Sequence, residues 1–60
     1  MLRDLRAHLY DIRDACQAIE EFVRNKTYDE YVSDRMLRSA VERQFIVIGE
    51  ALLHALRLAL

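Results

Sequence analysis

The chain has 60 residues, of which 53% are hydrophobic, and its nine basic and ten acidic residues give a formal net charge of −1. A domain of this size buries only about 60% of the surface that its unfolded chain exposes, so as a monomer it is marginally stable. The single cysteine excludes an internal disulfide framework, and the near-zero net charge does not favour nucleic acid as a partner. Association with other chains is the remaining way to gain stability.

The start of the chain mixes charged residues among apolar ones and never offers the uninterrupted apolar stretch of a signal peptide. Further along, Glu50, His54 and Arg57 interrupt the most apolar segment, which is also shorter than the ~20 residues that a bilayer requires. A lone unpaired thiol suits a reducing compartment. We therefore expect a cytoplasmic protein that does not enter a membrane.

Residues 2–25 are predicted to form the first helix. Apolar residues recur there at alternating intervals of three and four, which is typical of a helix packed nearly parallel to another. Cys16 lies within this stripe and is expected to behave as a small hydrophobe. The predicted seam consists of Leu2, Leu5, Leu9, Ile12, Cys16, Ile19 and Val23.

Residues 26–34 are predicted to connect two helices. Thr27 and Glu30 have the spacing of a capping box, in which each side chain bonds to the backbone N–H of the other residue, so a short helical turn is expected there. Ser33 and Asp34 then supply an N-cap for a second long helix.

Residues 35–60 are predicted to form that second helix, about 39 Å long. Twelve of the sixteen residues from 45 to 60 are apolar, whereas one neighbouring helix can cover only one stripe. Gly49 costs ~1 kcal/mol relative to alanine in mid-helix, which indicates a close approach by another element. We therefore predict that a second protein chain covers this half of the helix, in a dimer or a tetramer. The predicted oligomer interface consists of Phe45, Ile48, Gly49, Leu52, Ala55 and Leu56.

The expected fold class is thus all-α: an antiparallel helical hairpin with a short connector, forming a single domain over residues 1–60 and assembling into an intermolecular helical bundle.

Arg3, His8 and Tyr10 are the weak catalytic candidates. Their spacing resembles the Arg-x4-His-x-Tyr motif of HEPN-type ribonucleases, in which the arginine can hold a phosphate and the histidine can transfer protons at an RNA backbone. The alternative is an ordinary amphipathic helix end.

His54 lies four residues after Glu50, which suggests that the two form a hydrogen-bonded pair at an interface. Two such ligands do not make a metal site. We predict neither a metal nor a cofactor.

Residues 38–51, with the sequence RSAVERQFIVIGEA, closely resemble the second main helix of HepT-like proteins. These are HEPN-domain toxins encoded beside a minimal nucleotidyltransferase antitoxin. Residues 9–12, 18–20 and 27–31 resemble the same family in the same order, so the resemblance covers nearly the whole chain.

The resemblance implies an antiparallel helical bundle, a homodimer and an RNA-cleaving or translation-blocking toxin that its antitoxin neutralises. In the family the Arg-x4-His-x-Tyr motif lies on later helices, so its catalytic roles are not carried over to Arg3, His8 and Tyr10. We therefore expect this chain to lack the catalytic motif and to act through self-association. The alternatives are a non-enzymatic helical oligomerisation module and a fragment of a longer protein.

Overall fold

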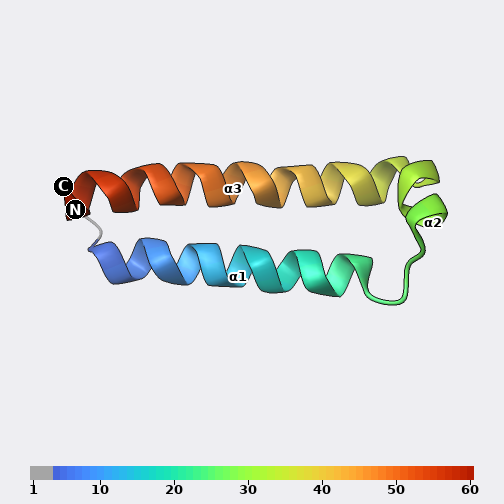
Figure 1. Cartoon of the computed structure of the whole chain (residues 1–60), viewed down its shortest axis with the longest axis horizontal. Helices are drawn as coiled ribbons and strands as arrows, with labels where there is room; N and C mark the ends of the chain where they lie inside the picture. The colour runs from blue at the N-terminus through green and yellow to red at the C-terminus, as the bar shows by residue number, and fades with distance from the viewer. Residues whose placement is uncertain (1–3) are drawn as a thin grey trace.

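The computed structural model describes residues 4–60, which form three helices and no strand. Helix α1 spans Leu5–Val23, α2 spans Tyr28–Ser33 and α3 spans Arg35–Ala59. The two long helices lie side by side and run in opposite directions, with α2 at the turn between them (Figure 1). The hairpin measures 41 × 19 × 16 Å. The predicted all-α hairpin is therefore confirmed, while its assembly into a bundle remains a prediction.

Local side chains account for where each helix begins. The Asp4 carboxylate accepts from the backbone N–H of Ala7 at 2.9 Å, and the Asp34 carboxylate accepts from the N–H of Leu37 at 3.0 Å. Each bond satisfies an N–H that has no partner inside its own helix. Asp34 thus confirms the predicted N-cap of the second long helix.

The predicted capping box is present at the start of α2. The Thr27 hydroxyl accepts from the N–H of Glu30 at 3.1 Å, and the Glu30 carboxylate accepts from the N–H of Thr27 at 3.0 Å. The pKa of Glu30 lies below its ordinary value of 4.5, chiefly because its carboxylate accepts from the backbone N–H of Thr27, with further contributions from the Thr27 side chain and the charge of Lys26. The connector is therefore an ordered helical turn.

Helix α1 ends two residues before the predicted limit of residue 25. Asn25 takes a left-handed conformation, with φ at 61°, and the N–H of Lys26 donates to the carbonyl of Val23 at 3.0 Å. Asparagine tolerates this conformation better than most residues with a Cβ, which makes it a suitable helix terminator. The chain then turns into α2, which packs mainly against α3.

The core between α1 and α3 is narrow and built mainly from small residues. Of the described apolar side chains, only Ala15, Val41, Ala51 and Ala55 are buried, and no large side chain is fully enclosed. Alanines on facing helices allow the two backbones to approach closely, but they bury little apolar area. The hairpin therefore leaves most of its larger apolar side chains partly in water.

Candidate association surface

Helix α3 carries an unusual number of exposed apolar side chains. Those between residues 45 and 60 that expose about half of their surface or more are Phe45, Ile46, Leu52, Leu53, Leu56, Leu58 and Leu60. Single exposed apolar residues are common on proteins, whereas a group in which Phe45, Leu52 and Leu56 share one side of a helix is typical of an interaction site. The structure therefore leaves α3 with an apolar surface that α1 does not cover.

The six residues predicted to form the oligomer interface fall into two groups. Phe45, Leu52 and Leu56 are 59%, 48% and 48% exposed and remain available to another chain. Ala55 is only 4% exposed because it packs against α1, and Ile48 is half-buried. The sequence pattern alone did not separate the side of α3 that faces α1 from the side that faces outwards.

Gly49 lies on the exposed part of α3. A Cβ atom built on it would meet nothing within 4 Å in the described part of the chain. The close approach expected at this residue is therefore not made by α1 or α2. Its place in an interface with a second chain stays a prediction.

Exposed apolar residues are also present on α1, where the sequence pattern had assigned them to the helix seam. Leu5 and Leu9 are 39% and 49% exposed, and Cys16 is an exposed free thiol. The seam position predicted for Cys16 is wrong, because the buried α1 positions that face α3 are His8 and Ala15. Leu2 belongs to the same predicted seam but lies outside the described residues.

The catalytic candidates do not come together in the hairpin. His8 is buried, at 8% exposure, and its ring stacks on that of His54 with centroids 5.2 Å apart. Tyr10, two residues later, projects from a different side of the helix and is 51% exposed, with the Arg13 guanidinium 5.0 Å from its ring centroid. Arg3 lies outside the described residues.

For His54, the predicted interfacial pair with Glu50 stays a prediction. Its ring contacts His8 across the hairpin, and Glu50 is exposed. Within residues 4–60 there is no group of three or more histidine, cysteine or acidic side chains that could hold a metal ion. Over the same residues, no helix is both long enough and apolar enough to cross a bilayer.

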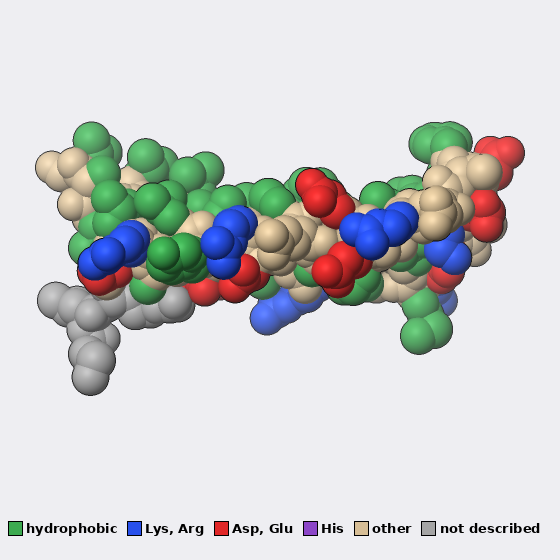
Figure 2. Space-filling view, turned by 90° about the horizontal axis from the view of Figure 1, so that it is seen from below, with side chains coloured by type: hydrophobic (Ala, Val, Ile, Leu, Met, Phe, Trp, Pro, Cys, Tyr) green, Lys and Arg blue, Asp and Glu red, His purple; other side chains and the backbone are tan. Residues whose placement is uncertain are grey.

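The two faces of the hairpin differ in character. Looking onto α1, Figure 2 shows acidic and basic side chains along the outward side of that helix, with hydrophobic side chains gathered along the upper edge of the view. The hydrophobic group is densest toward the end where the two termini lie. The charged side chains thus gather on the outward side of α1, and much of the exposed apolar surface lies along one edge of the hairpin.

Comparison with known proteins identifies relatives over most of the chain. A protein "Putative RNase MJ1380" of Methanocaldococcus jannaschii is 41% identical over 49 residues, which cover 82% of this chain and 45% of that protein. "Putative RNase MJ0127" of the same organism is 43% identical over 49 residues, covering 82% of this chain and 40% of its own length. "Probable ribonuclease HepT" of Thermococcus cleftensis is 37% identical over 51 residues, which cover 85% of this chain and 46% of that protein.

The chain spans less than half of the length of these relatives. No solved structure gives a significant match. A family model described as ribonuclease HepT-like matches residues 12–58, which include α1 from Ile12 onward, the whole of α2 and nearly all of α3. On this match, the chain belongs to the ribonuclease HepT-like family.

Proposed function

We propose that this chain acts as a self-associating helical hairpin within a HepT-like toxin–antitoxin system. The observation that carries the proposal is the exposed apolar surface of α3, which includes Phe45, Leu52 and Leu56 at about half exposure each. If a partner covered these side chains, the free energy of the complex would fall by roughly 25 cal/mol for each Å² of apolar surface removed from water. Association would recover this free energy, which the narrow alanine-rich core does not supply.

The total surface area supports the same proposal. The chain exposes 5021 Å². A compact monomer of 7.1 kDa is expected to expose ~4,100 Å². The excess of roughly 900 Å² is close to the ~800 Å² that each partner contributes to a standard protein interface. The accessible surface of the chain thus exceeds that of a compact protein of its mass by about the area that one partner contributes to an interface.

In this proposal, Arg3, His8 and Tyr10 of one chain do not carry out the ribonuclease activity of the family. His8 faces α3, and Tyr10 points to another side of α1, so neither converges with the other on one phosphate. In this proposal the hairpin supplies packing surface, and any RNA cleavage uses residues that this hairpin does not bring together. The partner that neutralises the system is a minimal nucleotidyltransferase antitoxin, in the cytoplasm.

Sedimentation velocity across a concentration series tests the self-association directly. We expect the purified chain to sediment as a dimer or tetramer at tens of micromolar and to dissociate on dilution. A folded monomer that persists over the whole series would overturn the proposal.

Co-expression with a minimal nucleotidyltransferase tests the partner. We expect the two chains to co-purify. Their separation under conditions that preserve both folds would remove the antitoxin from the proposal.

A further inference from the structure

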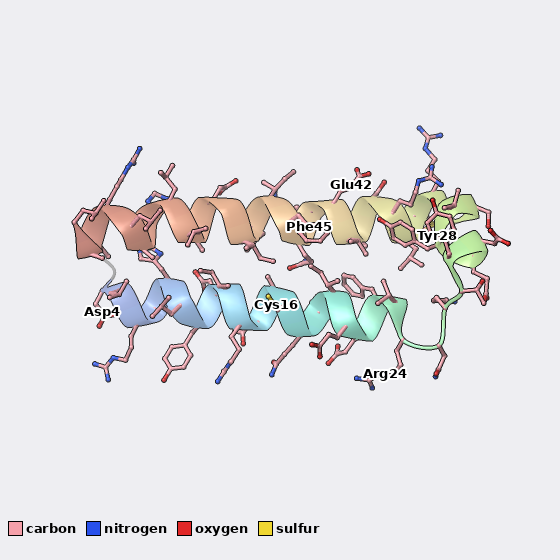
Figure 3. All side chains as sticks on the ribbon, in the orientation of Figure 1. Asp4, Cys16, Arg24, Tyr28, Glu42 and Phe45 are labelled. Atoms are coloured by element: carbon pink, nitrogen blue, oxygen red, sulfur yellow. The ribbon has the colours of Figure 1, made fainter. Side chains whose placement is uncertain are left out.

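The two histidines of the chain, His8 and His54, lie at the open end of the hairpin, with their ring centroids 5.2 Å apart. Of the described residues, none before His8 and none after Ala55 is buried. Figure 3 shows Asp4 at this end and Tyr28 at the opposite end, where the chain turns from α1 into α3. No chain connection joins the two helices at the open end, so side-chain contacts such as the histidine stack hold them together there.

The two rings have different surroundings. His8 is only 8% exposed, whereas His54 is exposed. His8 also lies in the first turn of α1, where the free backbone N–H groups of a helix disfavour a positive charge. A proton is therefore accommodated more easily on His54 than on His8.

Four charged side chains lie three or four residues from the nearer histidine, which is about one helical turn. They are Asp4 and Asp11 on α1, and Glu50 and Arg57 on α3, while α2 lies at the other end of the hairpin. Asp11 is half-buried and the other three are exposed. Three carboxylates against one guanidinium favour a first proton on the histidine pair. The exposed charges act through water, which screens them, whereas the two rings are in direct contact.

One proton fits this stack, but two do not. A cation over the face of a neutral aromatic ring is a favourable arrangement, so a stack of one charged and one neutral ring is stable. Two charged rings with centroids 5.2 Å apart repel each other, and the repulsion is stronger where burial excludes water from one of them.

We propose that the stack of His8 and His54 is a proton-sensitive latch: the closed end of the hairpin holds at most one proton on the two rings, and a second proton separates the start of α1 from the end of α3. The latch belongs to a single hairpin and does not depend on self-association or on the family's activity. Histidines in water change charge between about pH 5 and pH 8. Unfolding lets both rings take up a proton, and stability rises with pH wherever the unfolded chain binds more protons. The hairpin is therefore most stable at the upper end of this range and loses stability as the pH falls.

Urea unfolding of the dissociated chain at a series of pH values, followed by circular dichroism, counts these protons. Between about pH 7.5 and pH 5.5, we expect the unfolding constant to rise roughly tenfold for each unit that the pH falls, which corresponds to about one proton taken up on unfolding. In His54→Phe a ring still lies against His8 but cannot be charged, so we expect almost no pH dependence in this range. A wild-type chain whose stability is constant in this range, or rises in acid, would overturn the latch.

The reciprocal variant His8→Phe separates repulsion between the rings from burial of one ring. The latch requires that both variants lose the pH dependence of the wild type. If burial of His8 alone opposed the proton, only His8→Phe would lose it and His54→Phe would keep it. That result would contradict the latch.

Amide hydrogen exchange of the wild type locates the opening and does not depend on any variant. After correction for the intrinsic pH dependence of exchange, we expect residues 9–11 and 54–58 to exchange several-fold faster at about pH 5.5 than at about pH 7.5, and residues 15–19 to be unchanged. Equal acceleration along both helices would refute a local latch at the open end.

Discussion

The imidazole rings of His8 and His54 stack across the hairpin, with centroids 5.2 Å apart and ring planes inclined by 25°. One ring comes from the first turn of α1 and the other from the last two turns of α3. The contact therefore joins the two ends of the hairpin that α2 does not connect. It also gives His8 a structural role inside the fold.

We expect His8→Ala and His54→Ala each to lower the free energy of unfolding by ~1 kcal/mol, since each removes one partner of a stacked pair. The double variant should cost less than the sum of the two single variants, because the shared contact can be lost only once. Urea unfolding followed by circular dichroism measures all three. Strict additivity would contradict the contact. Tyr10→Ala serves as the control, because that ring is half exposed and should affect stability less.

We expect the purified wild type and His8→Ala to cleave RNA at the same rate. Absence of cleavage by both would also agree with this prediction. The reason is that His8 is only 8% exposed and faces another histidine ring, where it cannot reach a phosphate. The measurement is degradation of a labelled RNA at equal concentrations of folded protein. A loss of cleavage in His8→Ala, with folding and association preserved, would restore the Arg3, His8 and Tyr10 site.

Acid should weaken the α2 turn through Glu30. The pKa of this carboxyl in the folded chain lies below its ordinary value of 4.5, chiefly because it accepts from the N–H of Thr27. A lowered folded pKa means that the carboxylate contributes its full stabilisation above pH 4.5, and that this contribution is lost as the pH falls through the folded pKa. Glu30→Gln keeps the capping geometry without the charge. We expect a smaller drop in Tm between pH 7 and pH 3 for Glu30→Gln than for the wild type. An unchanged difference would refute the assignment.

Gly49→Ala is expected to stabilise the dissociated chain against unfolding by about 1 kcal/mol, because alanine is the better helix former and the new Cβ meets nothing within 4 Å. Thermal unfolding at concentrations below association measures this effect. Ser39→Ala, at an exposed α3 position, is the control for a general gain in helix propensity and should stabilise by less. A destabilised Gly49→Ala hairpin would mean that another part of the chain lies against Gly49.

The helices and their boundaries are largely determined by the sequence, because local interactions decide them. The capping box of Thr27 and Glu30 and the N-cap at Asp34 depend on side chains three residues away from the groups that they bond. The alternation of apolar residues at intervals of three and four likewise predicts helices without reference to any neighbour. The family resemblance also depends on linear order alone, and the match over residues 12–58 confirms it.

Only the tertiary structure decided which flank of each helix faces the other. An apolar stripe wider than one contact line allows several rotations of a helix about its axis, and spacing in the sequence does not choose among them. Ala15, Ala51 and Ala55 favour the observed rotation because small side chains let the two backbones approach closely. That rotation buries His8 and exposes Cys16, Leu9, Leu52 and Leu56. The surface available for association therefore depends on how the two helices are oriented relative to each other.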